Sequence, residues 1–512
     1  MAGPVAAGAG AASPVTGPRA GLSTSAARAV VEAARAAGHL RAEGWPRLLT
    51  RAQVLEDVLG PAHAPFTADD ADAMPGDGAV AAEARALARA KPAIADGLRV
   101  LMLRGAMPFE GLGSWPLEAA FRRDEAEILR AAMPTTLPVV DRPPVIGPDG
   151  EMDYRGHLSV ILKATRRCNL RCGYCSDWRA DGAPIPLDIW VPAFRDILGS
   201  GRWSRIDMVW HGGEPTLLGR RGVVRLAMGQ QCLARPGVAV ANSMQTNGST
   251  VTPRMAALLA ALDFSVSVSL DGFDEVHDRR RPDRHGRGSY HRAVAGLDRL
   301  REAGLDPGVL VVVGQDLVAR GADALLGGLA EIGVRRAGLL VERPAHGTEA
   351  TTEPVPLRDF LDFLLEVHAT RCDGCHPWIG IREIDEPLAA LRGQTPSHCE
   401  LLGNCQGAVV ALEPDGRLSH CDKYLGDPDY ILGETTSAAL DGPRIADLKA
   451  RDRTARAALT GCRWSSVCRG WCPHERHLQQ RLTGQTPRCC GLAPLFEGLS
   501  AMEGAGRERA RA

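Results

Sequence analysis

The sequence lacks an excess of either charge. Its 60 basic and 61 acidic residues give a net charge of −1, whereas proteins that bind nucleic acid or an acidic membrane through their overall field carry a strong basic excess. We therefore expect neither nucleic acid nor a membrane as a partner. Hydrophobic residues make up 45% and charged residues 24% of the chain, which is typical of globular proteins. At roughly 150 residues per domain, the length allows about three domains and a sizeable core.

The sequence also lacks a long apolar segment. No apolar run approaches the roughly 18 residues of a membrane-spanning helix, and the start of the chain has no basic segment followed by an apolar one, as a secretory signal would. The 14 cysteines do not indicate a disulfide framework, because a chain of this size needs no covalent staples and its cysteines cluster in metal-ligand spacings. These observations predict a cytoplasmic protein with reduced cysteines.

Composition and periodicity divide the chain into six parts. Residues 1–24 are rich in Gly, Ala and Pro and are expected to be disordered. Residues 25–148 have small apolar residues at helical spacing, then a Pro-rich linker. Without a catalytic constellation, this N-terminal domain is interpreted either as a docking domain for a peptide or partner, or as a helical cover. The remaining parts are an alternating strand and helix region, 149–345; a bridging segment, 346–398; a cysteine-rich region, 399–498; and a tail, 499–512.

Apolar runs alternate with helical stretches in the third part. Repeated βα units with nearly continuous apolar strands predict an α/β fold with a parallel sheet, and ligands of such sheets bind at the carboxyl ends of the strands. The expected strands are 158–162, 206–210, 238–240, 264–268, 309–313 and 338–341, with helices at 253–262, 290–303 and 322–332. A further helix is expected at 357–369, in the bridging segment.

Three cysteines follow the first of these strands at the spacing C-x3-C-x2-C: Cys168, Cys172 and Cys175. Three thiolates on one short loop can converge on a soft metal centre and leave one coordination position for another ligand. A zinc site is an alternative, but it usually has four protein ligands. A chance cluster of buried cysteines is a second alternative. The spacing favours an iron–sulfur site over both.

Polar and glycine-rich motifs follow the next three strands. Gly212 and Gly213 lack side chains, so their backbone can approach a ligand closely, although a Gly-Gly pair by itself is only a turn. Arg281 can clamp a carboxylate through two nitrogens, whereas its neighbours Arg279 and Arg280 are expected on a solvated face. The motifs are His211-Gly212-Gly213-Glu214-Pro215, Gln245-Thr246-Asn247-Gly248 and Ser269-Leu270-Asp271-Gly272.

The cysteine spacing, with Tyr174 before the third cysteine, resembles the signature of the radical S-adenosylmethionine (radical SAM) enzymes. This resemblance implies a partial (β/α)6 barrel. It also implies a [4Fe-4S] cluster on Cys168, Cys172 and Cys175, and S-adenosyl-L-methionine on the fourth iron. An external electron donor such as flavodoxin or ferredoxin would drive cleavage of this cofactor to a 5′-deoxyadenosyl radical. The residues implied in cofactor binding are Tyr174, Gly212, Gly213, Glu214, Gln245, Ser269, Asp271 and Arg281.

The cysteines after residue 398 closely follow the SPASM extension, which carries two auxiliary [4Fe-4S] clusters in many maturases. By motif position Cys399, Cys405, Cys421 and Cys472 hold the first cluster, and Cys462, Cys468 and Cys490 contribute to the second. The remaining position of the second set is Leu459. Cys489 or another residue supplies that ligand, or the cluster has an open iron, or it is absent. A zinc ribbon is disfavoured because the region has no C-x2-C knuckle; the isolated Cys372 and Cys375 receive no role.

The motifs together resemble those of the anaerobic sulfatase-maturating enzymes and their peptide-modifying relatives. In these relatives an Asp at the position of Asp422 is implicated as the base that removes a substrate proton. The alternative is a turn Asp that bonds to its own backbone. We expect a maturase of a ribosomally made peptide or protein. Crosslinking is favoured over formylglycine formation, because of the N-terminal extension and the incomplete second cysteine set. A non-catalytic iron–sulfur or zinc scaffold would not need the cofactor pocket.

Overall fold

The computed structural model describes residues 108–109, 113–114, 145–146 and 152–509, except for 155, 176, 180–181, several positions between 221 and 237, 344–354, 375, 425, 435–438, 441, 460 and 485–488. The chain divides into two compact units, 1–135 with 224–236 and 136–223 with 237–512. The first unit contributes the antiparallel pair β1 (Pro108–Phe109) and β2 (Gly113–Ser114). The predicted disorder of 1–24 and most of the predicted helical domain lie outside the described residues. The second unit carries the predicted motifs.

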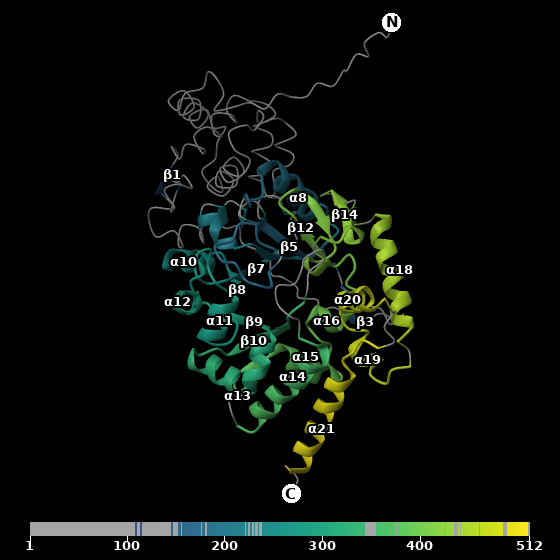
Figure 1. Cartoon of the computed structure of the whole chain (residues 1–512). Helices are drawn as coiled ribbons and strands as arrows, with labels where there is room; N and C mark the ends of the chain where they lie inside the picture. The colour runs from purple at the N-terminus through teal and green to yellow at the C-terminus, as the bar shows by residue number, and fades with distance from the viewer. Residues whose placement is uncertain are drawn as a thin grey trace, which may run out of the picture. The chain divides into compact units, whose positions relative to one another are not determined.

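A ten-stranded sheet forms the centre of the second unit (Figure 1). Its first seven strands lie in chain order and each pairs in parallel with the next, which confirms the predicted α/β class and parallel sheet. The strand β7 runs to Thr246, well beyond the predicted 238–240, because polar residues interrupt its apolar pattern. These strands are β5 (His157–Thr165), β6 (Arg205–Gly212), β7 (Ala239–Thr246), β8 (Phe264–Ser269), β9 (Gly308–Val313), β10 (Arg336–Val341) and β11 (Gly380–Ile381).

Helices connect these strands. In α10 the Thr252 side chain accepts the Met255 N–H and Pro253 occupies the first turn, which satisfies a free donor and pre-sets the backbone. In α12, a Cβ on Gly296 would lie 2.1 Å from the Gly248 carbonyl oxygen, so this helix can approach the end of β7 only with glycine there. The helices are α8 (Leu187–Gly199), α10 (Pro253–Ala261), α11 (Asp274–Arg280), α12 (Tyr290–Glu302) and α13 (Gln315–Glu331).

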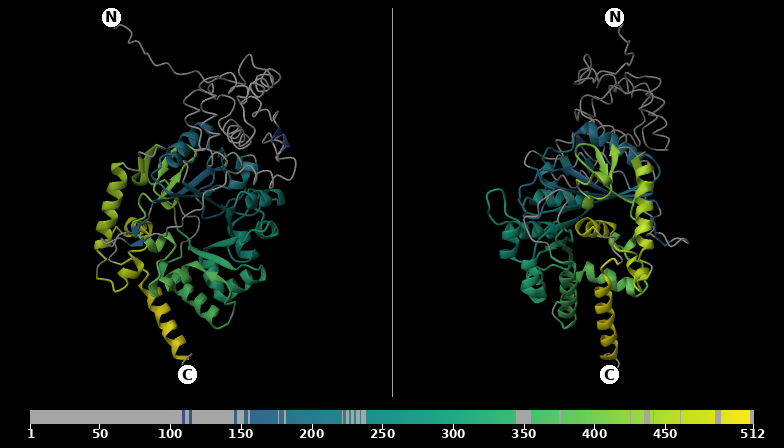
Figure 2. Two further views of the ribbon diagram at one scale, coloured as in Figure 1. Left: turned by 180° about the vertical axis from the view of Figure 1, so that it is seen from behind. Right: turned by 45° about the vertical axis from the view of Figure 1, so that its right-hand side comes forward.

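The cysteine-rich region adds three strands to the same sheet, at its opposite edge. The strand β12 pairs in parallel with β5, with Leu412 opposite Leu162. Antiparallel strands then continue the sheet outward, and the light-green strands lie beside the barrel strands in both views of Figure 2. The C-terminal region is therefore joined to the strand that leads into the Cys168 loop. The three strands are β12 (Val409–Leu412), β13 (Arg417–Ser419) and β14 (Ile431–Glu434).

Helices and short 3-10 turns complete the C-terminal half. The predicted helix at 357–369 is confirmed and continues to Cys372; it contacts α13 and the last helix. The helices are α14 (Leu357–Cys372), α15 (Arg382–Leu391), α16 (Cys399–Leu402), α18 (Pro443–Ala457), α19 (Ser465–Cys468), α20 (Pro473–Thr483) and α21 (Ala493–Arg509). The 3-10 turns are η1 (Pro215–Leu218), η2 (Asp422–Tyr424) and η3 (Pro428–Tyr430).

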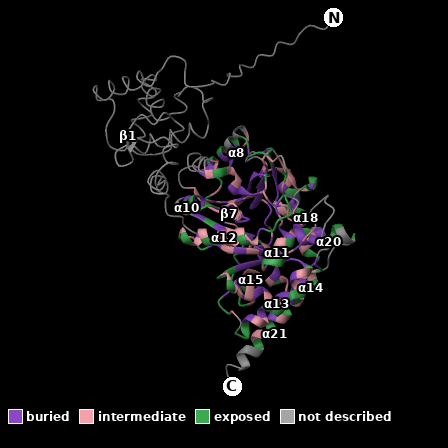
Figure 3. Cartoon of the chain, turned by 60° about the vertical axis from the view of Figure 1, so that its left-hand side comes forward, coloured by how far each residue is buried: buried purple, intermediate pink, exposed green. Residues whose placement is uncertain are grey.

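The core lies along the strands, which Figure 3 shows largely in the colour of buried residues. In β5 nearly every residue from Leu158 onward is buried, including Leu162 and Ala164. Lys163 lies between these two and is 1% exposed. A buried ammonium group is costly unless it is paired, so its partners mark a specific polar site inside the apolar strand. Within the described part of the chain, no helix is long and apolar enough to cross a membrane.

Candidate active site

The loop after β5 presents the three cysteines with hydrogen-bond donors at each sulfur. The Cys175 N–H donates to the Cys172 carbonyl at 3.1 Å, which closes the turn between these two residues. Donors that face a sulfur stabilise a bound thiolate and tune a cluster that it holds. The donors are the Leu170 N–H for Cys168 at 3.4 Å, the Asp177 N–H for Cys175 at 3.4 Å and Arg281 Nη1 for Cys172 at 4.0 Å.

Burial raises the pKa of Cys168 to about 11 and that of Cys172 to about 12. These thiols therefore keep their protons until a metal displaces them, as expected for metal binding coupled to deprotonation. Among the described residues, no three His, Cys, Asp or Glu side chains converge closely enough to hold one ion. A four-iron cluster offers each thiolate a different iron and needs wider spacing than one ion. Three cysteines under N–H donors fit such a cluster.

The end of β6 is pressed against the cysteine loop, and only glycine fits there. A Cβ on Gly212, whose φ is +114°, would lie 2.3 Å from the Thr165 carbonyl oxygen, and one on Gly213 would lie 2.2 Å from that of Arg167. The Gly213 N–H donates to Thr165 O at 2.8 Å. The close backbone approach that the sequence indicated is therefore present. The group approached in this structure is the backbone of the cysteine loop.

Glu214, predicted to contact the cofactor, is fully buried. Its carboxylate accepts the Thr216 hydroxyl at 2.6 Å, the Thr246 hydroxyl at 2.7 Å and the Asn247 N–H at 2.7 Å. These bonds hold the end of β7 against the end of β6. Its cofactor contact remains a prediction, and in this structure the carboxylate binds protein groups.

Gln245 and Ser269 come from the ends of neighbouring strands and lie together. The Gln245 Nε2 donates to Ser269 Oγ at 2.7 Å. Two predicted cofactor contacts thus meet at one point above the sheet, where a parallel fold places its ligands.

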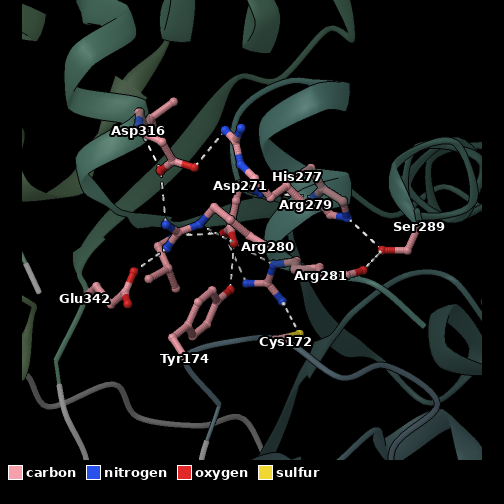
Figure 4. Close-up of polar contacts among 12 residues, drawn as sticks. Cys172, Tyr174, Asp271, His277, Arg279, Arg280, Arg281, Ser289, Asp316 and Glu342 are labelled. Carbon is pink, nitrogen blue, oxygen red and sulfur yellow. Dashed lines mark hydrogen bonds and ion pairs between the residues drawn. The ribbon is translucent and has the colours of Figure 1, made fainter. Parts of the chain in front are cut away.

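The predicted arginine clamp is present, but the carboxylate it holds belongs to the protein. Arg281 donates to Asp271 through Nε at 2.9 Å and Nη2 at 3.2 Å (Figure 4). Asp271 also accepts the Tyr174 hydroxyl at 2.7 Å and the Val312 N–H at 2.9 Å. Burial raises the pKa of Asp271, but the charges of Arg281 and Arg280 outweigh burial and hold that pKa below its usual value. Asp271 is thus the centre of a buried ionic cluster.

The prediction that Arg280 belongs to a solvated face is wrong. Arg280 is 7% exposed and donates to Glu342 at 2.6 Å and to Asp316 at 3.1 Å, as Figure 4 shows. Arg279 is exposed, as predicted, and pairs with Asp316. Each residue of a helix is rotated about 100° from the one before it, so consecutive arginines in α11 point to different surroundings. The run of arginines could not show which of them faces inward.

Lys163 is the centre of a second buried ionic cluster, which the sequence analysis missed. Its Nζ lies 2.6 Å from Asp177 Oδ2, 3.1 Å from His211 Nδ1 and 3.4 Å from Asp422 Oδ2. Arg166 extends the cluster by pairing with Asp177 and with Glu413. The only available signal was a lysine within the apolar run of a buried strand.

Asp422 is not the simple turn residue of the alternative interpretation, because its carboxylate faces Lys163 and the Cys421 thiol. Burial raises the pKa of Asp422, but the charges of Lys163 and His211 outweigh burial and hold that pKa well below its usual range. The carboxylate is therefore ionised in the neutral range, as a proton acceptor must be.

The four cysteines assigned to the first auxiliary set lie within electrostatic reach of one another. Burial raises the pKa of Cys405, and the charges of Cys399 and Cys472 raise it further; the same two charges also raise the pKa of Cys421. Cys421 has a φ of +63°, an uncommon backbone conformation that orients its thiol. Lys423 Nζ lies 3.8 Å from the Cys472 sulfur. Four thiols with a nearby cation form a donor set that fits an iron–sulfur cluster.

The second set is different. The sulfurs of Cys468 and Cys490 lie 3.3 Å apart, and the Gly491 N–H donates to Cys489 Sγ at 3.3 Å. The Cys490 thiol donates to Cys468, which lowers the pKa of Cys468 to about 7. Leu459 is 4% exposed and packs as an ordinary core residue. Of the isolated pair, Cys372 is exposed and lies 3.8 Å from the His368 ring, while Cys375 lies outside the described residues.

A cavity of about 280 Å³ adjoins Asp422 and Tyr174. Its walls come from the barrel end of β10, from α14 and α15, and from the C-terminal helices. Apolar residues and paired charges share the surface. They include Leu340, Phe360, Arg382, Glu400, Trp471 and Glu475. This cavity connects the two residues that face the cysteine loop and the auxiliary region, respectively.

These features define the class of protein. A parallel βα sheet runs from its first strand into three thiols, and a glycine-only strand end lies against that loop; this is the arrangement of a radical SAM domain. Residues 162–316 match the model of the radical SAM superfamily. The chain therefore contains a radical SAM domain, and the protein is a radical SAM enzyme.

Comparisons outside that domain point to one group of relatives. The chain is 29% identical over 346 residues to a serine-type anaerobic sulfatase-maturating enzyme of Klebsiella aerogenes, with coverage of 65% of this chain and 83% of the relative. It is 25% identical to a cysteine-type enzyme of Clostridium novyi, with coverage of 62% and 88%. The solved structure of native anSMEcpe with bound AdoMet superposes with a TM-score of 0.58 at 20% identity, over 67% of this chain and 95% of that one. The fold is therefore shared with that enzyme.

Proposed function

We propose that this radical SAM enzyme oxidises a side chain of a peptide or protein substrate. The observation that carries the proposal is the position of Asp422. Its ionised carboxylate is paired with Lys163 inside the barrel and lines the cavity next to Tyr174. A substrate side chain in that cavity would reach both the radical site and a proton acceptor.

The bound cluster and S-adenosyl-L-methionine would supply a 5′-deoxyadenosyl radical that takes one hydrogen atom from the substrate. Cys168, Cys172 and Cys175 would hold the cluster, and the ends of β6, β7 and β8 would hold the cofactor. The substrate then loses a proton and an electron. Asp422 accepts the proton, and an oxidised iron–sulfur or flavin carrier accepts the electron. The substrate thereby loses two hydrogens in total.

Two products are consistent with this balance. We favour a crosslink, either a thioether or a carbon–carbon bond, because Leu459 replaces a cysteine of the second auxiliary set and 148 residues precede the barrel. The second candidate is formylglycine. It is supported by the sulfatase-maturating relatives, which share more than 80% of their length with this chain. The precursor or protein substrate and the electron donor are part of the proposal.

Mass spectrometry of two peptide probes tests the function. The first probe is the product of a short open reading frame adjacent to the gene, if present; the second is a synthetic sulfatase-type peptide with Ser or Cys at the target position. Each is incubated with reconstituted enzyme, S-adenosyl-L-methionine and a reductant. A crosslink removes two hydrogens and gives no reaction with an aminooxy reagent. Formylglycine reacts with that reagent. Failure to form 5′-deoxyadenosine under any condition would contradict the assignment of the cysteine loop.

A further inference from the structure

Lys163 connects the two loops on which the proposed chemistry depends. It lies in β5, five residues before Cys168, and is 1% exposed. Toward the barrel loop it pairs with Asp177 at 2.6 Å, two residues after Cys175. Toward the C-terminal region it pairs with Asp422 at 3.4 Å, next to Cys421. One ammonium group thus bridges carboxylates from segments that lie 245 residues apart in the sequence.

The surroundings leave this bridge little freedom. On one side His211 Nδ1 lies 3.1 Å from Lys163 Nζ, at the position directly before Gly212. On the other side Arg166 pairs with Asp177 and with Glu413, which directly follows β12. Because β12 pairs with β5, Glu413 is held beside Lys163 by sheet hydrogen bonds. The charged groups facing Lys163 therefore come from three strand ends and two loops.

We propose that Lys163 is a positioning residue that fixes the Asp422 carboxylate relative to the cysteine loop. This inference rests on the proposed function, in which Asp422 accepts the substrate proton. A buried ammonium group offers three donors that rotate but cannot leave without exposing two carboxylates to an apolar environment. Lys163 thereby sets the distance between the site of hydrogen abstraction and the base. A misplaced base costs rate, because catalytic groups act over a narrow range of distances.

The first test is a double-mutant cycle on stability, which needs no substrate. Lys163→Met keeps the length of the side chain and removes its charge, and Asp422→Asn removes the opposing charge. If the two residues act as a pair, the loss of melting temperature in the double variant is smaller than the sum of the single losses. Additive losses would overturn the proposal. Lys449→Met is the matched control, since Lys449 is exposed on α18.

The second test separates cofactor cleavage from product formation, with whichever of the two peptide probes is modified. Lys163→Met is expected to keep its iron content, its EPR signal and the KM for the peptide. It should form 5′-deoxyadenosine while product formation falls about 100-fold, the lower range of a general base's contribution. Lys449→Met should behave as wild type. Equal losses of cofactor cleavage and product would mean that Lys163 serves only the fold. If wild type modifies neither peptide, the proposed function fails, while the stability cycle still decides the pairing.

Discussion

Arg281 holds Asp271 through two nitrogens, Nε at 2.9 Å and Nη2 at 3.2 Å, while its third nitrogen lies 4.0 Å from the Cys172 sulfur. The same carboxylate accepts the Tyr174 hydroxyl. One guanidinium therefore links a cluster ligand, an aromatic residue of the same loop and the end of β8. The cofactor-binding role predicted for Arg281 would act through this linkage.

Arg281→Lys keeps the charge but loses the planar fork. A lost charge-assisted hydrogen bond costs roughly 1.5–3 kcal/mol, and the freed Asp271 carboxylate would shift Tyr174 and the cysteine loop. We expect the affinity for S-adenosyl-L-methionine to fall about tenfold at unchanged iron content, measured by equilibrium dialysis under anaerobic conditions; about 1.4 kcal/mol of the loss would then reach the cofactor site. Arg279→Lys is the matched control, because Arg279 is exposed in the same helix. Equal dissociation constants for both variants would remove Arg281 from the cofactor site.

Replacing Cys168, Cys172 and Cys175 together by Ala tests the separation of the cysteine sets. The C-terminal cysteines lie in other loops and share no ligand with this one, so the auxiliary iron should remain visible by Mössbauer or EPR spectroscopy. Formation of 5′-deoxyadenosine should disappear. Wild-type protein should correspondingly bind more iron than one [4Fe-4S] cluster contains. Retained cofactor cleavage in the triple variant would be incompatible with the assigned role of the loop.

Leu459 leads to a prediction about the second auxiliary set. If an iron there lacks a cysteine ligand, it can accept a thiolate, because iron in such clusters favours sulfur. A cysteine-containing precursor peptide should then perturb the EPR signal of the wild type, and Leu459→Cys should suppress this response.

Cys489→Ala is the control for that experiment, since Cys489 is the spare thiol beside Cys490. If Cys489→Ala loses a cluster and the wild type responds to no thiol, then Cys489 closes the site. In that case the open-iron hypothesis fails.

His277 predicts how stability depends on pH. Its Nδ1 accepts the Asp271 N–H at 3.2 Å, so the ring is neutral and its Nε2–H faces Ser289 Oγ at 3.0 Å. Burial and the Arg281 charge lower the pKa of His277 to about 4. The unfolded chain, with a pKa near 6.5, binds this proton first, so the free energy of unfolding decreases as pH falls from about 6.5 toward 4.

The change attributable to His277 between pH 7 and pH 5 is roughly 1–2 kcal/mol. His277→Gln should therefore give a shallower dependence of the free energy of unfolding on pH, measured by isothermal denaturation of reconstituted protein. An identical slope in wild type and variant would show that the ring is already protonated in the folded state.

Local patterns carried the fold and the cysteine loop. The strands of the barrel were predictable because both faces of a parallel sheet are buried and its strands are nearly continuous apolar runs. Gly212 and Gly213 were identified because glycine at a strand end has few other uses. Arg280 could not be placed, because the sequence gives its charge but not the rotation of α11 against the core.

The sequence by itself determined which chemistry is available: three thiols at a fixed spacing, glycines at a strand end, and a second group of cysteines after residue 398. These depend on residue type and short separations. The tertiary structure decided which charges meet. Lys163 and Asp422 are 259 residues apart, and their contact exists because β12 pairs with β5 and brings the C-terminal loop to the barrel end. Such pairing depends on sheet hydrogen bonds between distant segments, which no local pattern records.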